Sequence, residues 1–123
     1  MTALGDTFHF DPFGAANNHL WIAIGERTKD GARDIVIVSI TTWHQRADET
    51  CKLVCTERGM HPFVKHESFV YYRGTMIVPE APLDAQKANK RQRLSPELLA
   101  RVQQGAHASP QTPRWLKAFV PKP

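Results

Sequence analysis

Residues His19–Thr42 read HLWIAIGERTKDGARDIVIVSITT, and this stretch decides which fold the sequence predicts. Two apolar runs stand on either side of a polar segment with a Gly turn, a pattern that is typical of a β-hairpin. If the two runs pair as strands, the imidazole of His19 at the start of the first comes close to Thr41 and Thr42 at the end of the second. The stretch therefore predicts a β-sheet with a polar site at its rim.

The two apolar runs differ in the faces that they bury. Ile35–Ile40 is apolar on both faces, as expected of a central strand that is covered on two sides. The first run alternates. One of its faces is expected to hold Leu20, Ile22 and Ile24, and the other Trp21 and Ala23.

Further strands are predicted before and after this hairpin. Thr7–Phe10 alternates polar and aromatic residues, and Ser68–Tyr72 is dense in aromatic and β-branched residues. Cys51–Cys55 is a plausible further strand, on which the two thiols would share one face. Thr75–Val78 is expected to form a short strand after a bulge at Gly74.

The last third of the chain predicts helices. Ser95 is a good N-cap and Pro96 suits the first helical position, while Gly105 is a natural stop. A second short helix is expected near Thr112–Pro113, with Trp115 anchoring it on the sheet. Short strands with Gly-containing turns, followed by helices, predict a mainly β fold with C-terminal helices, a small SH3-like antiparallel β-barrel.

A chain of 123 residues has the usual size of one domain. We expect residues 1–108 to form the barrel with its C-terminal helix, and residues 109–123 to pack on it as an extension of the same domain. No apolar run reaches the roughly 20 residues that a membrane helix needs. The N-terminus lacks the basic and apolar regions of a signal peptide. The sequence thus predicts no membrane association and a cytoplasmic location.

The net charge of +4 and the pI near 9.3 allow an anionic partner. Four cations without an acid lie between Lys87 and Arg93, and such a cluster either neutralises phosphates or forms a solvated loop. Cys51 and Cys55 would lie roughly 13 Å apart on a strand. A disulfide needs Cα atoms within about 7 Å, so free thiols are expected. No set of residues has the spacing of a metal site, and no cofactor is expected.

The order of several motifs resembles the MazF/PemK toxin family. The motifs are GDTFHFDPFG (5–14), HLWIAIG (19–25), IVIVSITT (35–42), ESFVYY (67–72) and LSPELLARVQQGA (94–106). The resemblance covers roughly residues 5–105. Its near-literal matches are Gly5–Asp6, Ile40–Thr41 and Ser68.

This resemblance implies a homodimeric barrel that cuts single-stranded RNA without a metal, beside an antitoxin whose disordered tail fills the RNA groove. In the family an Arg at the head of the second strand supplies charge and proton transfer, and a hydroxyl at the end of the third strand holds the phosphate. Here His19 occupies the Arg position, and the loop Phe13–Asn18 contains no Arg. The implied catalytic residues are His19, which can transfer protons near neutral pH, and Thr41 as the phosphate ligand.

Other residues are candidates for binding the nucleic acid. Basic groups interleaved with aromatic rings are typical of single-strand grooves, where each stacked base contributes about 1–3 kcal/mol. For Phe69 and Tyr71, which share a face, burial preference favours a place in the core or in a dimer contact over binding. The candidates are Thr42, Trp43, His44, His61, Lys65, His66, Ser68 and Arg73.

Two hypotheses follow from the sequence. In the first, the chain is a toxin-like endoribonuclease of a toxin–antitoxin system, with single-stranded RNA as substrate and an acidic antitoxin as partner. In the second, the chain is a catalytically inactive MazF-like barrel that binds nucleic acid or protein through the same groove. The loss of the Arg favours the second hypothesis, and the histidines beside hydroxyl groups favour the first.

Overall fold

The computed structural model describes residues 1–14 and 18–123, so part of the loop before His19 lies outside the described residues. Six antiparallel strands form one sheet in the order β4-β5-β3-β2-β1-β6. The strands are β1 (Thr7–Phe10), β2 (His19–Lys29), β3 (Ala32–Thr42), β4 (Lys52–Leu53), β5 (Ser68–Pro79) and β6 (Lys90–Arg91). The helices are α1 (Glu80–Asp84), α2 (Pro96–Ala108) and α3 (Arg114–Lys117), with 3-10 turns at Glu49–Cys51 and Lys87–Asn89.

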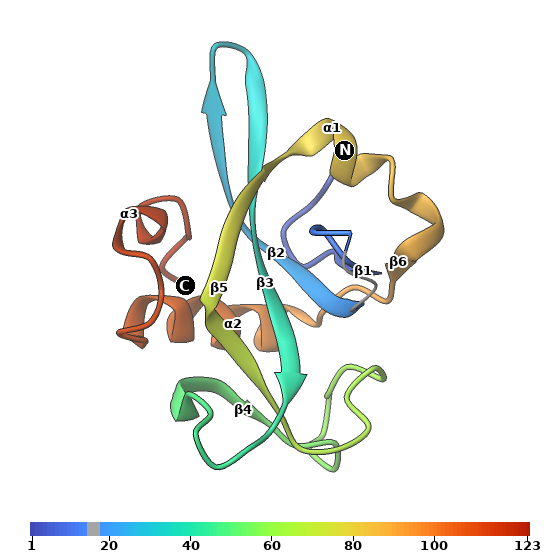
Figure 1. The fold of residues 1–123 in the computed structure, drawn as a ribbon, viewed down its shortest axis with the longest axis vertical. Coiled ribbons are helices and arrows are strands. Elements are labelled where there is room, and N and C mark those ends of the chain that lie inside the picture. The colour runs from blue at the N-terminus through green and yellow to red at the C-terminus, as the bar shows by residue number, and fades with distance from the viewer. Residues whose placement is uncertain (15–17) are drawn as a thin grey trace.

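The sheet curls into a half-barrel, and the β2–β3 hairpin projects from it (Figure 1). A mainly β fold with C-terminal helices is therefore confirmed. Within the described residues the sheet stays open, because the two-residue strands β4 and β6 lie at its edges.

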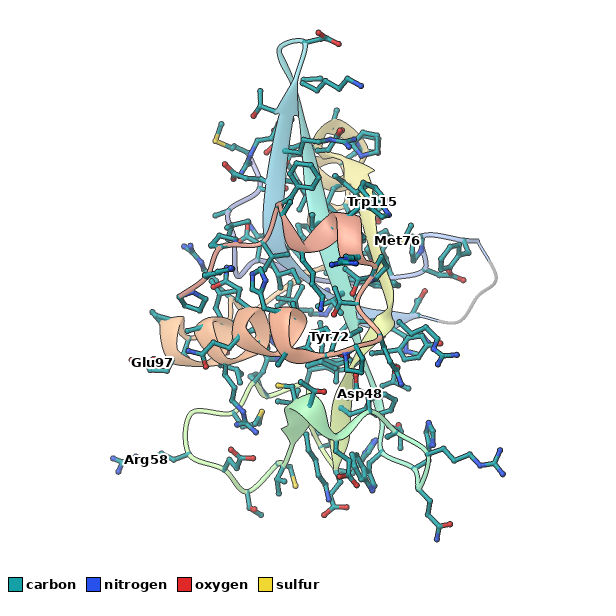
Figure 2. All side chains as sticks on the ribbon, turned by 90° about the vertical axis from the view of Figure 1, so that its left-hand side faces the viewer. Asp48, Arg58, Tyr72, Met76, Glu97 and Trp115 are labelled. Atoms are coloured by element: carbon teal, nitrogen blue, oxygen red, sulfur yellow. The ribbon has the colours of Figure 1, made fainter. Side chains whose placement is uncertain are left out.

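The main core lies between one face of the sheet and the helices α2 and α3 (Figure 2). The alternation predicted for the first apolar run is confirmed, since one face of β2 enters this core and the other faces away. Ser95 caps α2 as predicted, with its hydroxyl oxygen accepting a hydrogen bond from the Leu98 N–H at 3.2 Å. The residues of β2 and α2 that meet in this core are Leu20, Ile22, Ile24, Leu98, Val102 and Ala106.

Gly105 does not end α2, which continues to Ala108. The glycine instead allows a close approach, because a Cβ at this position would lie 2.1 Å from the Tyr72 hydroxyl oxygen. Tyr72 is fully buried and its hydroxyl donates to the Val102 carbonyl oxygen at 2.7 Å. The helix therefore packs directly onto β5 at this glycine.

Residues 109–123 close the same core. Leu116 of α3 and Val120 are buried in it, and the Phe119 carbonyl oxygen accepts a hydrogen bond from the Glu26 N–H at 3.0 Å. The prediction that Trp115 anchors α3 is wrong, since its side chain is 56% exposed and its neighbour Leu116 supplies the buried contact.

The predicted strand Cys51–Cys55 is largely wrong. Cys51 ends a 3-10 turn, and only Lys52–Leu53 pair with β5. Both thiols are free, but Cys51 is buried while Cys55 is exposed, so they do not share a face. The two strands predicted around Gly74 are one continuous strand, β5, in which Ile37 pairs with Met76 and Ser39 with Tyr71. Residues 72–75 therefore bulge opposite Val38.

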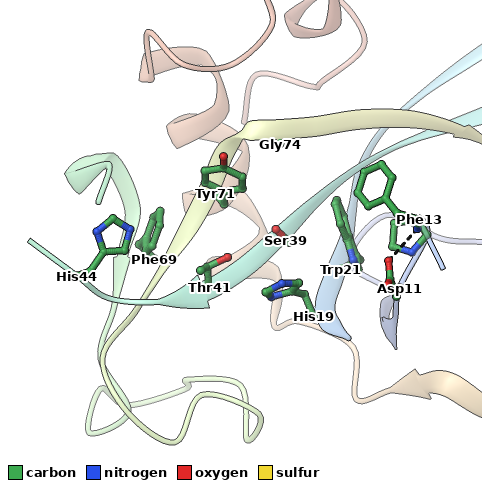
Figure 3. A pocket seen from close by; sticks show the side chains of 11 residues that line it. Asp11, Phe13, His19, Trp21, Ser39, Thr41, His44, Phe69, Tyr71 and Gly74 are labelled. Carbon is green, nitrogen blue, oxygen red and sulfur yellow. Dashed lines mark hydrogen bonds between the residues drawn. The ribbon is translucent and has the colours of Figure 1, made fainter. Parts of the chain in front are cut away.

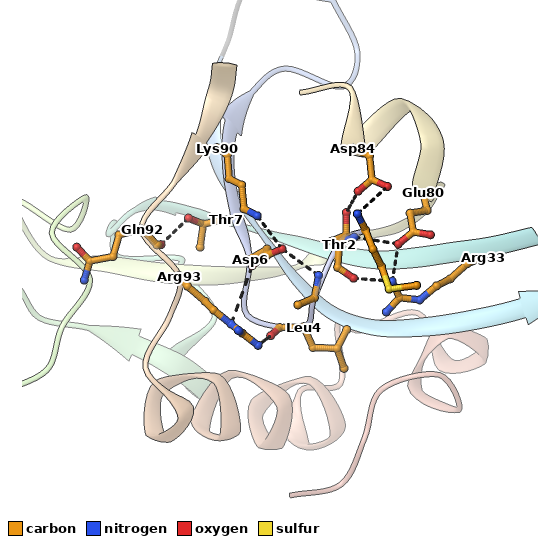
Figure 4. A network of polar contacts seen from close by, with 12 residues as sticks. Thr2, Leu4, Asp6, Thr7, Arg33, Glu80, Asp84, Lys90, Gln92 and Arg93 are labelled. Atoms are coloured by element: carbon orange, nitrogen blue, oxygen red, sulfur yellow. Dashed lines mark hydrogen bonds and ion pairs between the residues drawn. The ribbon is translucent and has the colours of Figure 1, made fainter. Parts of the chain in front are cut away.

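The basic stretch between Lys87 and Arg93 is partly neutralised (Figure 4). The carboxylate of Asp6 lies 3.2 Å from Lys90 Nζ and 4.0 Å from Arg93 Nε. Asp6 Oδ2 also accepts the Ala3 N–H at 2.9 Å, so these contacts tie the N-terminal segment to β6. Among the described residues, no helix is long and apolar enough to span a membrane.

Candidate functional site

The face of the sheet opposite α2 is covered only in part. Leu83 of α1 packs on the end of this face nearest the β2–β3 hairpin, together with Phe8, Ala23, Ile35 and Ile37. Towards the other end, near His19 and the C-terminal end of β3, the face carries polar and aromatic side chains over a pocket of about 510 Å³ (Figure 3). This pocket is the candidate site.

The register of three strands builds the floor of the pocket. Trp21 pairs with Ser39, and Ser39 pairs with Tyr71, so these side chains form a row on one face of the sheet. Two residues along each strand, the same face carries a second row of His19, Thr41 and Phe69. The alternation that sends Leu20 and Ile40 into the core therefore points both rows into the pocket.

His19 and Thr41 come together as predicted. They lie side by side between Trp21 and Phe69, and both side chains are half-buried (Figure 3). They also line a second, smaller hollow of about 270 Å³, together with Thr42, His66 and Ser68. There the Thr42 hydroxyl oxygen lies 3.0 Å from His66 Nε2. An imidazole and a hydroxyl thus stand at the junction of two hollows.

Aromatic rings form the walls of the pocket. His44 packs edge-on against Phe69 with ring centroids 5.4 Å apart, and Tyr71 packs on Phe69 at 6.1 Å. Phe13, from the loop after β1, is 73% exposed at the rim, where its N–H donates to Asp11 Oδ1 at 2.8 Å. Gly74 completes the wall, because a Cβ there would lie 2.8 Å from the Tyr71 ring. Flat apolar walls of this kind suit a planar ligand.

Trp21 leaves one polar group at the pocket without a partner. Its side chain is 4% exposed, and Nε1 has no hydrogen-bond acceptor among the described residues. A buried donor without an acceptor is unfavourable by about 1–3 kcal/mol.

Two predicted site residues are buried, and their side chains form hydrogen bonds with the protein backbone. His61 is 5% exposed, its Nε2 lies 2.5 Å from the Gln92 carbonyl oxygen, and its Nδ1 accepts the Phe63 N–H at 3.0 Å. Burial lowers the pKa of His61, although its hydrogen bond to Gln92 acts in the opposite direction. Ser68 is also buried, and its hydroxyl donates to the His66 carbonyl oxygen at 3.1 Å. We therefore leave His61 out of the site, whereas Ser68 stays at the edge of the smaller hollow.

The remaining predicted residues lie around the pocket. Trp43 packs against Phe69 with centroids 6.2 Å apart, and Lys52 Nζ stands 4.3 Å from the Trp43 ring, so this indole is covered on one face. Lys65 is exposed and lines none of the hollows described here. Arg73 lines a separate hollow next to the pocket.

Sequence reasoning missed several residues of the pocket. Trp21 and Ser39 lie two residues from His19 and Thr41 on their strands, so the strand period of two was a signal that could have found them. Tyr71 and Phe69 carried the same signal but were expected in the core or a dimer contact. No sequence pattern pointed to Phe13, because its position at the pocket depends on the path of the loop after β1.

The side chains at the site define the chemistry that it offers. Within residues 1–14 and 18–123, no three His, Cys, Asp or Glu side chains are grouped closely enough to hold a metal ion. The junction of the two hollows offers imidazoles for proton transfer and hydroxyl groups for hydrogen bonding.

Comparison with protein-family models, curated proteins and solved structures gave no match to this chain.

Proposed function

We propose that this chain is a toxin-like endoribonuclease built on a MazF/PemK-type, SH3-like barrel, which cleaves single-stranded RNA without a metal. The observation that carries the proposal is the placement of His19 and Thr41 side by side, at the floor of an aromatic pocket. The aromatic walls suit bases that are not paired, since stacking on such rings binds single strands.

The proposed reaction needs one proton acceptor and one proton donor. His19 takes the proton from a ribose 2′-OH, and the 2′ oxygen attacks the adjacent phosphorus. The bond from phosphorus to the 5′ oxygen breaks, leaving a 2′,3′-cyclic phosphate and a 5′-OH end. His66, which shares the smaller hollow with His19, donates the proton to the leaving oxygen. The Thr41 hydroxyl donates a hydrogen bond to the phosphate, where negative charge develops.

Cleavage of a long single-stranded RNA by the purified protein, with a chelator present, tests this proposal. We expect His19→Ala to lower the rate by about 10²–10⁴, the range for general acid–base groups. Thr41→Ala should lower it by roughly 10–10², as expected for a lost hydrogen bond to a charged group, while Thr41→Ser should keep most activity. Thr28→Ala, at an exposed position outside both hollows, serves as the matched control.

Cutting that survives both His19→Ala and Thr41→Ala would overturn the assignment. Cleavage that occurs without the chelator and stops when it is added would show that a metal takes part. Cyclic phosphate ends on the products would support attack by the 2′ oxygen.

The second candidate is a barrel that binds nucleic acid or protein without cutting. The aromatic walls favour it, because stacking needs no proton transfer. A folded wild-type protein that binds RNA but does not cut it would support this alternative. His19→Ala should then change affinity little, whereas Tyr71→Ala should weaken binding by roughly tenfold or more.

The resemblance also leads us to propose a cytoplasmic homodimer with an acidic antitoxin as partner. The net charge of +4 and the exposed Phe13 at the pocket rim suit an acidic, partly apolar segment. Light scattering during size exclusion measures the dimer directly, and a mass of one chain at micromolar concentration would contradict it.

A further inference from the structure

A third hollow, of about 340 Å³, adjoins the candidate site on the side away from His19. It shares three aromatic side chains with the pocket, so the two hollows have a common wall. Beyond that wall its lining changes to Arg46, Asp48, Arg73 and Gln111. We refer to these four residues and the space they line as the arginine hollow. The shared side chains are His44, Phe69 and Tyr71.

Arg46 and Arg73 are cations without a carboxylate partner within the described part of the chain. Both side chains are exposed at the hollow. Other arginines are used inside the protein, for example Arg27 with Asp34 at 2.9 Å and Arg101 with Glu57 at 2.7 Å. The two guanidinium groups are therefore free to bind an anion from outside.

The one acidic residue that lines the arginine hollow is already occupied. Asp48 Oδ2 accepts the Ser109 hydroxyl at 2.5 Å, and Oδ1 accepts the Thr50 N–H at 2.9 Å and the Thr50 hydroxyl at 2.5 Å. Burial alone would raise the pKa of Asp48, but these hydrogen bonds together hold it below its ordinary value. These donors satisfy its oxygens and keep it ionised, so the arginine hollow carries two guanidinium charges against one carboxylate charge.

The same contacts hold the hollow in place. Ser109 caps the C-terminal end of α2, is fully buried, and accepts the Gln111 N–H at 3.1 Å while donating to Asp48. The Arg46 N–H in turn donates to His44 Nδ1 at 3.1 Å. The loop that carries Arg46 is thereby tied to the end of α2 and to the wall of the pocket.

We propose that the arginine hollow is a phosphate subsite, in which Arg46 and Arg73 bind a backbone phosphate of the RNA that neighbours the one held between His19 and Thr41. This assignment rests on the proposed function. Guanidinium groups bind phosphate through two parallel hydrogen bonds, which imidazole cannot do. The subsite therefore supplies the fixed positive charge that a histidine at position 19 does not, and the base between the two phosphates stacks on the exposed Tyr71.

Binding of a 2′-O-methyl oligonucleotide, which lacks the attacking hydroxyl and cannot be cut, tests the subsite. Fluorescence anisotropy over a range of salt concentrations gives the affinity and its salt dependence. We expect the double variant Arg46→Gln/Arg73→Gln to bind roughly tenfold more weakly or worse. The slope of log K against log salt should fall by about 0.7, the value for one phosphate contact to a single strand.

Arg58→Gln is the matched control. Arg58 is also an exposed arginine without an ion pair among the described residues, and it points away from the molecule (Figure 2). This variant should bind with wild-type affinity and slope. A double variant that behaves like Arg58→Gln, with an unchanged melting temperature, would overturn the subsite.

The cleavage assay separates this proposal from the proposed function. The double variant should raise KM and keep kcat within a few-fold, because its arginines do not touch the reacting atoms. Cleavage that depends on His19, with no effect of the double variant on KM or slope, overturns the subsite and leaves the function standing. Binding with the expected slope change but no cleavage supports the subsite and overturns the reaction. Binding of poly-glutamate without binding of the oligonucleotide overturns both.

Discussion

The imidazole of His61 is enclosed by its own loop and by the segment that follows β6. Because Nδ1 accepts the Phe63 N–H, the proton of the neutral ring lies on Nε2, which donates to the Gln92 carbonyl oxygen. A charged ring would have no acceptor at Nδ1 in this arrangement. Burial also lowers the pKa of His61 in the folded protein, because it takes the charged ring out of water.

This lowered pKa has a consequence for stability against acid. As the pH falls below about 6.5, the ordinary value, the unfolded chain protonates His61 while the folded protein does not. The unfolded state then binds more protons, so we expect the free energy of unfolding to fall from this pH downwards. Urea unfolding between pH 7.5 and 5 measures the slope, and His61→Gln should make it shallower.

Two comparisons make this expectation specific. The exposed Gln104→Ala, which changes no titratable group, should keep the wild-type slope. The carboxylates of Asp48, Glu57 and Asp84 also have lowered pKa values, but their ordinary values of 3.8 to 4.5 place their effect at lower pH. An unchanged slope in His61→Gln would show that His61 is not held neutral.

At the scale of the elements, α2 and β5 meet where Gly105 faces Tyr72. Helix propensity alone favours Gly105→Ala by about 1 kcal/mol. The added Cβ would overlap the Tyr72 hydroxyl, which cannot move without losing its bond to Val102, so we expect a net loss of about 1–3 kcal/mol. Chemical denaturation measures the change, and the exposed Gln104→Ala should stay within about 0.5 kcal/mol of wild type. A more stable Gly105→Ala protein would contradict the close packing.

Most strands could be predicted from the sequence, because their apolar residues either alternate, as in Leu20–Ile24, or form a continuous β-branched run, as in Ile35–Ile40. The strand predicted at Cys51–Cys55 failed because its apolar residues follow a 3-10 turn and pair with β5 over only two positions. Gly105 was wrongly predicted to end α2, because its role depends on a contact distant in the sequence. A glycine near a helix end reads locally as a stop, whereas here its role depends on Tyr72, which lies 33 residues earlier in the sequence.

The candidate site was predictable only where strands place it. His19 and Thr41 follow from the pairing of one hairpin, which local sequence specifies. The arginine hollow brings Arg46 from a loop together with Arg73 from a bulged strand and Gln111 from beyond α2. No short-range pattern links these three residues, and His61 differs from His66 only in a burial that the whole fold decides.

For the whole molecule, residues 109–123 belong to the core of the same domain. Burial of Leu116 and Val120 contributes roughly 1.5–3 kcal/mol each, a large part of the total stability of about 5–15 kcal/mol. We expect a chain that stops at Ala108 to unfold at a much lower temperature or to stay unfolded. Circular dichroism during heating measures this effect.

Removal of residues 121–123 is the control for this truncation. These residues are exposed, so the melting temperature should stay unchanged. A chain of residues 1–108 that melts like the full chain would show that the sheet and α2 are stable without residues 109–123.

The hydrogen bond from Glu26 to Phe119 also bears on the order of events during synthesis. It joins residues 93 positions apart, and the core that it closes needs Leu116 and Val120 in place. Contacts at such long sequence separation form late and slow the folding of β-rich chains. A ribosome that has released the whole sheet still holds a nascent chain with an open core, so the core behind the pocket cannot close until residues 113–120 have emerged. The exposed core would leave a period in which a chaperone or a partner could bind first.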